Sequence, residues 1–214
     1  MADPPYSPKT FERLVESSAG AHGHLCAGQV VGVRMALLGC RLIGLDLPLK
    51  GPEIKKLIVW VEMDRCTADA VSHTTGVKLG RRSLKFKDYG IMAATFHNLE
   101  TGVSFRVIST EEARDLVRLY APELAGEKEQ AITAYKRMPE SVLFRVQQVR
   151  VDLDESDLPG PTRSKVVCDR CGQTVRDGRE RIRGGRPLCR PCAQEAYFRE
   201  ARDINWEGME TSPL

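Results

Sequence analysis

The fold is decided by the segment Gly20-Ala-His-Gly-His-Leu-Cys-Ala-Gly-Gln-Val-Val-Gly-Val-Arg-Met-Ala-Leu-Leu-Gly-Cys40. It begins as a turn rich in glycine and histidine and continues as a stretch that is apolar on nearly every side of a helix. A helix of that kind is buried. Gly28 and Gly32 lie one turn apart, and each lowers helix propensity by roughly 1 kcal/mol. Such glycines are tolerated where another backbone or a ligand comes close. The segment therefore predicts a buried helix with a close neighbour.

The flanking sequence predicts further helices and an antiparallel sheet. Ser7 followed by Pro8 is typical of a helix start, and apolar residues at helical spacing continue this helix to about Ala19. Residues 57–61 are short, β-branched and preceded by Gly-Pro, which indicates a buried strand. The other expected elements are a helix at 66–74, a hairpin of strands at 91–97 and 103–108, helices at 110–120 and 127–137, and a strand at 142–151. Together they predict an α+β core in which helices pack on an antiparallel sheet.

Length and composition limit the class of protein. With 214 residues and 42% hydrophobic content, the chain is long enough for one sizeable core and a smaller unit. Its apolar runs are too short or too interrupted for a membrane span, so we expect a soluble protein with no membrane segment. The first ten residues lack the apolar stretch of a secretory signal, and seven cysteines cannot all pair within one chain. We therefore expect a reducing, cytoplasmic setting.

The domain organisation follows from a change in composition near residue 155. Residues 153–165 are polar and contain Pro159-Gly160-Pro161, which is typical of a linker. We expect a core domain over residues 1–155, a linker over 156–165, and a small module over 166–214.

The small module carries a zinc motif. Cys168-x2-Cys171 and Cys189-x2-Cys192 are separated by 17 residues, which is the two-pair spacing of structural zinc sites. A module of this length has too little core to fold without a metal. The second pair leads into residues 193–202, which we expect to form a helix whose N-terminal dipole favours thiolates. The motif predicts a treble-clef-like finger with a C-terminal helix and one structural zinc bound by the four cysteines.

The finger is also rich in arginine. Residues 163–192 contain nine basic side chains and three acidic ones. The arginines that could follow a phosphate backbone are Arg176, Arg179, Arg181, Arg183 and Arg186. Neither a base-reading helix nor an array of aromatic residues accompanies them. We therefore expect a docking or dimer surface, with nucleic-acid binding as the less favoured alternative.

A second cluster of metal-type ligands lies in the core. The pattern His22-x-His24-x-Cys26 is followed, after the first predicted strand, by Cys66-x2-Asp69. Imidazole and thiolate suit zinc or another transition metal, and Cys66 shares a helix face with Asp69. We predict that His22, His24, Cys26 and Cys66 converge on one metal or reactive centre, with Asp69 as a ligand or orienting group. Alternatives are catalysis by a Cys26 thiolate with His22 as base, or a capping histidine beside buried cysteines.

A third set of candidates is a basic stretch that starts at Lys78. It could bind an anionic ligand, although solvated charge is the alternative. The candidate ligand-binding residues are Thr75, Arg81, Arg82 and Lys85. The chain has no Walker loop, no G-x-G-x-x-G and no G-x-S-x-G motif, so nucleotide hydrolysis, ordinary dinucleotide binding and an α/β-hydrolase elbow have no support.

Three runs taken together resemble a known family. They are His22-Gly-His-Leu-Cys-Ala-Gly28, Val61-Glu-Met-Asp-Arg-Cys-Thr-Ala-Asp-Ala70 with Thr75-Gly76, and Gly90-Ile-Met-Ala-Ala-Thr-Phe96. In this order they are similar to the E-type subunit of formylmethanofuran dehydrogenase, over about residues 10–150. The four-cysteine module is similar to the zinc finger that some members carry. One departure is Val77, which stands where many relatives have a cysteine.

The resemblance implies an α+β core with a His/Cys pocket, often dimeric, that is linked by name to the molybdenum or tungsten enzyme of formylmethanofuran oxidation in one-carbon metabolism. Our first hypothesis is a metal-binding accessory or small-ligand-binding protein associated with such an oxidoreductase, and a homodimer. It has structural zinc in the finger and a second transition metal in the core. The second hypothesis is a stand-alone metal- or thiol-dependent enzyme. The third is a nucleic-acid-binding regulator that uses the arginine-rich finger.

Overall fold

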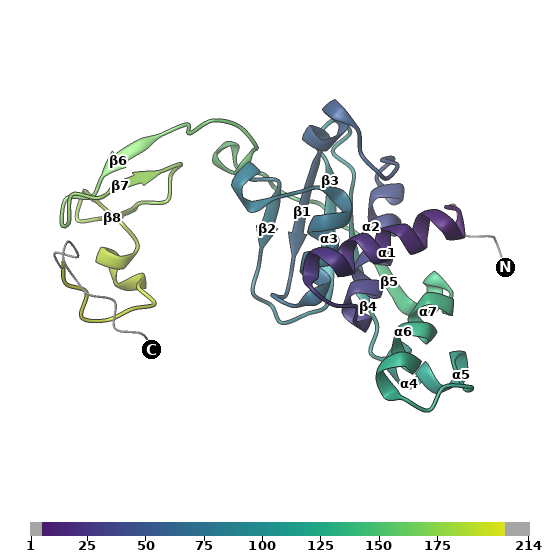
Figure 1. Cartoon of the computed structure of the whole chain (residues 1–214). Helices are drawn as coiled ribbons and strands as arrows, with labels where there is room; N and C mark the ends of the chain where they lie inside the picture. Colours follow the sequence, from purple (N-terminus) through teal and green to yellow (C-terminus); the bar gives the residue numbers. More distant parts are fainter. Residues whose placement is uncertain (1–5, 204–214) are drawn as a thin grey trace. The chain divides into compact units, whose positions relative to one another are not determined.

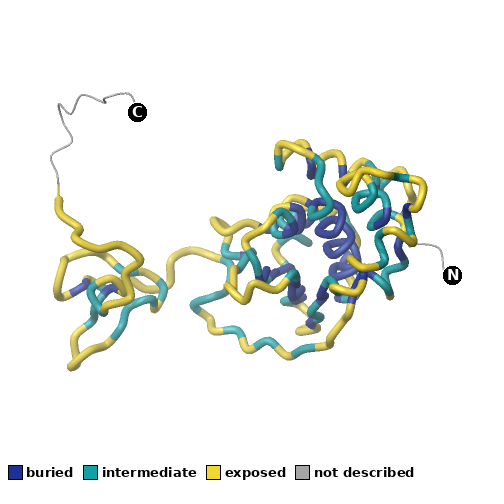
Figure 2. The backbone as a smooth tube through the Cα atoms, turned by 90° about the horizontal axis from the view of Figure 1, so that it is seen from below, coloured by how far each residue is buried: buried dark blue, intermediate teal, exposed yellow. Residues whose placement is uncertain are grey.

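The computed structural model describes residues 6–203 of the chain, which forms two compact units, Met1–Gly160 and Pro161–Leu214 (Figure 1). Gly160 lies inside the segment 156–165 that we expect to be a linker. Figure 2 shows that the buried residues are concentrated in the first unit, whereas most of the second unit is exposed. Within the described residues, no helix combines the length and the apolar character needed to span a membrane.

The first unit is built on a five-stranded sheet with the order β2-β1-β3-β4-β5 (Figure 1). The strands are β1 (Leu57–Val61), β2 (Leu84–Phe86), β3 (Ala93–Asn98), β4 (Ser104–Ser109) and β5 (Phe144–Gln148). All neighbouring strands are antiparallel except β1 and β2, which run parallel. The predicted α+β class, with helices on an antiparallel-dominated sheet, is confirmed.

Helix α2 (Ala27–Leu42) lies at the centre of the core, as its sequence predicts. Every residue from Gln29 to Cys40 is buried. A Cβ atom at Gly39 would lie 2.2 Å from the Phe96 ring, so the missing side chain lets the helix lie directly on β3. The largest buried apolar side chains of the surrounding cluster are Met35, Leu57, Phe96, Met138 and Leu143. Burial of such a side chain stabilises a fold by about 1.5–3 kcal/mol.

Two further helices, α1 (Pro8–His22) and α3 (Cys66–Thr75), pack against α2. A Cβ atom at Gly32 would lie 2.5 Å from the Ala70 Cβ and 2.7 Å from the Thr67 carbonyl oxygen. A Cβ atom at Gly28 would lie 2.9 Å from the Cys66 Cβ. The close neighbour that these two glycines predict is therefore helix α3.

The remaining helices of the first unit lie in its C-terminal half. They are α4 (Glu112–Asp115), α5 (Val117–Tyr120), α6 (Glu127–Arg137) and α7 (Glu140–Leu143). Elsewhere in the unit there are short 3₁₀ turns, η1 (Gly51–Lys56), η2 (Leu79–Arg81) and η3 (Glu155–Asp157). The buried Arg34 of α2 donates hydrogen bonds of 2.6 Å to the carbonyl oxygens of Tyr135 and Met138. Carbonyls at the C-terminal end of a helix carry partial negative charge, so they stabilise the guanidinium. Arg34 thereby fixes α6 against α2.

Two elements of this half differ from the sequence prediction. The single helix expected over 110–120 is interrupted at Leu116, between α4 and α5. The strand expected over 142–151 is shorter, because α7 includes its first two residues and pairing with β4 ends at Gln148. β5 is an edge strand, so it ends where its partner strand begins, at Ser104 and Phe105.

The second unit contains two small hairpins followed by one helical turn. The hairpins are β6 (Lys165–Val167) with β7 (Thr174–Arg176), and β8 (Arg181–Arg183) with β9 (Arg186–Leu188). The expectation of a helix over 193–202 is wrong, because the turn η4 spans only Pro191–Glu195 and residues 196–203 are not helical. Gln194 has a left-handed φ of 71°, which ends the turn. Tyr197 is 99% exposed, so the segment lacks the apolar packing that stabilises a short helix.

The contact of Gly32 with α3 leads to a stability prediction. We expect Gly32→Ala to lower the free energy of unfolding by about 1–3 kcal/mol, because the new methyl group overpacks the contact with Thr67 and Ala70. Gly20→Ala is the matched control, since a Cβ there has no atom within 4 Å. It should stabilise α1 by up to about 1 kcal/mol. Calorimetry of both variants measures these changes in stability. An unchanged melting temperature for Gly32→Ala would contradict the prediction and show that α2 and α3 move apart without cost.

Candidate metal centres

Three residues of types that commonly bind metals lie close together at the ends of helices in the first unit. His22 is the last residue of α1, Cys26 is the N-cap of α2, and Cys66 is the first residue of α3. One ligand atom from each lies within 4.8 Å of the other two. The structure thus brings together three of the five residues that the sequence predicts for this centre, and Asp69 contacts one of them. We call His22, Cys26 and Cys66 the core cluster.

Local backbone features place these side chains. Gly23 ends α1 with a left-handed φ of 97°, and its amide donates to the carbonyl oxygen of Ala19. A glycine adopts this conformation without strain, so the chain reverses immediately after His22. The reversal puts Cys26 at the start of α2, where its backbone is extended.

Cys66 is fixed to α2 by a buried amide. The Gln29 side chain donates to the Cys66 carbonyl oxygen at 2.8 Å and accepts a 2.5 Å hydrogen bond from the Ser18 hydroxyl. Thr67 adds a 3.3 Å hydrogen bond to the carbonyl oxygen of Gly28. Gln29 therefore joins α1, α2 and α3 at the level of the core cluster.

The imidazole of His22 is oriented by Asp69. Its Nδ1 lies 2.9 Å from Oδ2 of Asp69, whereas Nε2 is buried and has no hydrogen-bond partner in the structure. A carboxylate next to Nδ1 favours the tautomer with the proton there, which leaves a lone pair on Nε2. A histidine that binds a metal has this arrangement, with its other nitrogen bonded to a carboxylate.

The thiol of Cys66 is in an environment that disfavours a free thiolate. Burial is the largest cause that raises its pKa, and the neighbouring Cys26 thiol raises it further. A bound cation has the opposite effect and deprotonates a coordinating thiol. In the absence of a cation the Cys66 thiol therefore does not ionise readily.

His24 and His73 lie apart from the core cluster. The ring of His24 is 4.9 Å from that of His22, centroid to centroid, but His24 is exposed and is not one of the three converging ligands. His73, one turn beyond Asp69, has its Nε2 2.9 Å from the Ser17 hydroxyl oxygen. Cys40, predicted to be a core residue, is buried.

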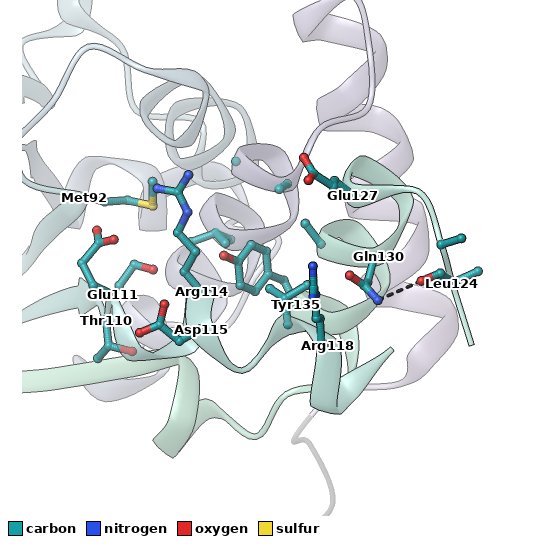
Figure 3. Close-up of a pocket in the computed structure, with 17 residues that line it drawn as sticks. Met92, Thr110, Glu111, Arg114, Asp115, Arg118, Leu124, Glu127, Gln130 and Tyr135 are labelled. Carbon is teal, nitrogen blue, oxygen red and sulfur yellow. Dashed lines mark hydrogen bonds between the residues drawn. The ribbon is translucent and has the colours of Figure 1, made fainter. Parts of the chain in front are cut away.

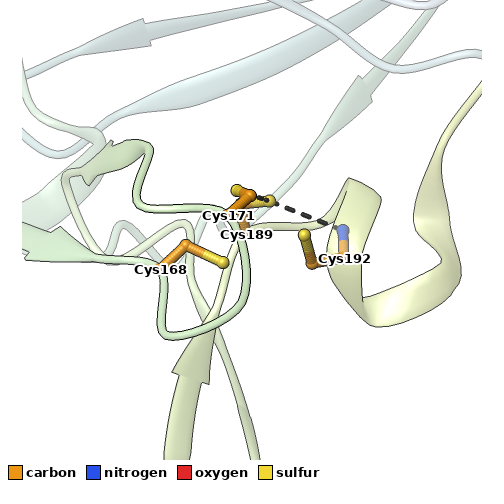
Figure 4. Close-up of side chains that lie close together, drawn as sticks. All are labelled: Cys168, Cys171, Cys189 and Cys192. Carbon is orange, nitrogen blue, oxygen red and sulfur yellow. Dashed lines mark hydrogen bonds between the residues drawn. The ribbon is translucent and has the colours of Figure 1, made fainter. Parts of the chain in front are cut away.

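The finger holds the second centre, formed by all four of its cysteines (Figure 4). Their sulfur atoms lie within 4.8 Å of one another, and the pair Cys171 and Cys189 is separated by 3.7 Å. The edge of a tetrahedron of sulfurs at the usual zinc distance is about 3.8 Å. The arrangement therefore fits one tetrahedral ion.

The thiols of the finger have strongly unequal acidities. Hydrogen bonding from backbone amides, that of Cys189 first, lowers the pKa of Cys168 to about 6. The Cys189 thiol is the largest cause that raises the pKa of Cys192 to about 12. Four adjacent sulfurs cannot all become thiolates without a compensating cation, and zinc supplies that charge.

Comparison with known proteins assigns both units. Residues 21–149, more than half of the chain, match the family described as "FmdE, Molybdenum formylmethanofuran dehydrogenase operon". The chain belongs to the FmdE family. Residues 160–198 match the prokaryotic dksA/traR C4-type zinc finger, which supports zinc as the ion of the four-cysteine centre. The family resemblance predicted from the sequence is therefore confirmed.

Two individual proteins are similar to this chain. A tungsten formylmethanofuran dehydrogenase FmdE-like protein from Syntrophus aciditrophicus has the same fold, with a TM-score of 0.57 and 19% identity over 91% of this chain and 96% of its own. A probable S-adenosyl-L-methionine-binding protein from Archaeoglobus fulgidus is 28% identical over 90% of this chain. The chain spans 56% of that relative, so the name belongs to a longer protein.

Beside the core cluster the FmdE core has an open groove with a volume of about 700 Å³. His22, Cys66 and Asp69 line it together with an apolar wall. The apolar wall consists of Val61, Met63, Ala68, Leu79, Leu84 and Phe86. A concave, mostly apolar surface with a few converging polar groups is typical of a small-molecule site. Sequence reasoning missed this wall because β2 reaches it only through parallel pairing with β1, which sets Phe86 beside Val61.

The four candidate ligand-binding residues lie outside the lining of this groove, which instead includes Lys78 from the same basic stretch. Those candidates are Thr75, Arg81, Arg82 and Lys85. Thr75 is buried and donates a 2.7 Å hydrogen bond to the carbonyl oxygen of Val71. Lys85 donates a 2.6 Å hydrogen bond to the backbone oxygen of Asp157.

Removal of zinc should unfold the second unit and leave the FmdE core folded, because structural zinc contributes roughly 10–16 kcal/mol to modules of this size. Hydrogen exchange after chelation checks this, with fast exchange expected in β6–β9 and unchanged protection in β3. Cys189→Ser should have the same effect as chelation, whereas Cys40→Ser should keep the finger zinc. Slow exchange in the finger after complete zinc removal would contradict the prediction.

Proposed function

We propose that this FmdE protein binds one transition metal in its core through His22, Cys26 and Cys66, and presents it to a small molecule in the adjoining groove. The observation that carries the proposal is the buried, unpartnered Nε2 of His22. A ring nitrogen of His22 converges with the sulfur atoms of Cys26 and Cys66, and Asp69 contacts Nδ1 of the same ring. A buried nitrogen lone pair without a partner is costly unless a donor or a metal satisfies it.

The donor set fits a borderline metal such as zinc. One nitrogen and two sulfurs are the ligands of a Cys₂His site, in which three protein ligands leave one position for water or substrate. The finger differs, because its four sulfurs complete a tetrahedron and close the site. Two of the three proposed ligands, Cys66 and His22, also line the groove, which supports access by a small molecule.

Each residue around the core cluster has a distinct role in this proposal. Asp69 orients the imidazole of His22, and Gln29 holds the first turn of α3 in place. The apolar wall of the groove binds the body of the small molecule and excludes water from its reactive end. When bound, a metal at this position supplies Lewis acidity toward a carbonyl or a water molecule.

A second candidate function is thiol chemistry without a metal, for which Cys26 is the nucleophile and His22 the base. The observation that favours it is that His22 lies close to the Cys26 thiol and is also hydrogen-bonded to Asp69. A base held by a third group in this way is the usual arrangement for an activated nucleophile. The number of metal ions bound per chain distinguishes the two functions, because only the first requires a metal in the core.

We further propose that the protein works with a molybdenum or tungsten formylmethanofuran dehydrogenase system, as an accessory component in a reducing, cytoplasmic setting and as a homodimer. The description of the family and the name of the Syntrophus relative support the association. The exposed arginines of the finger, Arg176, Arg183 and Arg186, are proposed as docking contacts.

The metal proposal predicts two metals per chain. After reduction and reconstitution, the full chain should bind one zinc in the finger and one further first-row ion in the core, measured by elemental analysis. Cys66→Ser should retain one metal, because the finger is intact. His24→Ala is the matched control and should retain two, since His24 is not one of the converging ligands.

The same experiment contradicts the proposal if the wild-type chain binds a single metal or if Cys66→Ser still binds two. A single metal together with rapid alkylation of Cys26 would instead favour the thiol mechanism.

The orienting role of Asp69 leads to a separate prediction. Asp69→Asn should weaken the affinity of the core for its metal by about 10- to 100-fold, as loss of such a partner does in other metal sites. Competition with a chromophoric chelator measures this affinity. Asp64→Asn is the matched control, because Asp64 lines the same groove but has no hydrogen bond to His22. Equal metal affinities of the two variants would show that Asp69 does not contribute to metal binding.

A further inference from the structure

The first unit has a second cavity, which the function proposed above does not use (Figure 3). It lies among the first turns of α2, the α4–α5 segment and α6, and has a volume of about 810 Å³. None of the residues of the core cluster lines it. Its size is within the range of about 300–1,000 Å³ that is usual for small-molecule sites.

The walls of this cavity are held in place by the fold. Gln130 on α6 donates hydrogen bonds of 3.0 and 2.8 Å to the carbonyl oxygens of Ala121 and Leu124, which fixes the connection between α5 and α6. The bonds of Arg34 to the end of α6 fix that helix to α2. The apolar part of the lining includes Val31, Met92, Val117 and Leu124. The cavity therefore has a preformed shape with one apolar side.

Five charged side chains line the cavity, two guanidinium groups and three carboxylates. They are Glu111, Arg114, Asp115, Arg118 and Glu127. In an uninterrupted helix, residues three apart lie side by side and such pairs form ion pairs. In the described structure neither Glu111 with Arg114 nor Asp115 with Arg118 forms one.

Tyr135 connects the charged and apolar sides. Burial raises the pKa of its hydroxyl, with Arg114 acting in the opposite direction and Glu111 in the same direction. The charges of Arg114 and Glu111 therefore both act on the pKa of the Tyr135 hydroxyl. Figure 3 shows the Tyr135 ring and the Arg114 side chain directed into the same space, with Met92 at its far end. Tyr135 thus remains a neutral hydrogen-bond donor at physiological pH.

The start of α2 adds further donors. Ala27 and Gly28, the first two residues of the helix, line the cavity, and the N-cap Cys26 makes no side-chain hydrogen bond to the first turn. Amides in the first turn have no partner within the helix, and this end carries partial positive charge. An anionic group in the cavity can accept hydrogen bonds from these amides and from the two arginines.

We propose that this cavity binds a small zwitterion, of modified amino-acid or dipeptide size, that carries a carboxylate, an ammonium group and an apolar body. Arg114, Arg118 and the start of α2 bind the carboxylate. Glu111 and Asp115 bind the ammonium group, and Glu127 lies apart from them in the cavity (Figure 3). The apolar body lies against Met92 and Leu124. All five charged side chains are exposed at the cavity, and they present both signs to it, so a ligand with only one charge is matched by only part of this lining and binds less well.

The test uses the zinc-loaded full chain and a panel of apolar amino acids and dipeptides. Each dipeptide is compared with its N-acetyl form, which has only the carboxylate, and with its amide, which has only the ammonium group. Binding is followed by shifts of backbone amide signals in NMR titrations. We expect saturable binding of at least one zwitterion, with shifts at Ala27, Gly28 and α5, and at least tenfold weaker binding of both single-charge forms.

Variants locate the binding. Arg114→Gln and Tyr135→Phe should each weaken it by at least tenfold, and Arg145→Gln, an exposed arginine on β5, is the matched control that should not. Cys66→Ser should leave it unchanged, so this result is independent of the core metal. The proposal is overturned if no zwitterion binds, if single-charge forms bind equally well, or if Arg114→Gln leaves folded protein with full affinity.

Discussion

The close approach of α2 and α3 is the constraint on which the rest of the first unit depends. Hydrogen atoms at Gly28 and Gly32 allow the backbone of α3 to lie where any side chain would collide with Cys66, Thr67 or Ala70. This contact sets the first turn of α3 beside the first turn of α2. The sulfur atoms of Cys26 and Cys66, which are forty residues apart in sequence, therefore face one another at the same level.

The four-cysteine zinc site and the core metal site that we propose differ in how far the protein encloses the ion. In the finger, four sulfurs surround one point, and the surrounding strands are too short to form a core of their own. The ion there replaces a hydrophobic core as the source of stability. In the FmdE core, the fold is complete without an ion, because α2 and the sheet supply the buried apolar surface. The metal that we propose at the core cluster is therefore not needed for folding and would be available to bind a ligand.

Local sequence patterns predicted the elements and sites that a single short stretch of sequence determines. The apolar stretch after Gly28, the β-branched run at 57–61 and the Cys-x2-Cys pairs each determine their own element or site, and each was predicted correctly. Non-local features escaped prediction. Parallel pairing brings Phe86 to the groove, and the helix expected over 110–120 is interrupted at Leu116. His24 matched the metal pattern, yet the reversal at Gly23 leaves it exposed.

We propose that the imidazole of His22 and two thiolates bind a metal in the core. The most direct test is X-ray absorption at the cobalt edge of the full chain with zinc in the finger and cobalt in the core. We expect a first shell of one imidazole nitrogen, two sulfurs and one further light atom, and loss of the imidazole signal in His22→Ala. A shell of four sulfurs, or one that contains no sulfur, would contradict it.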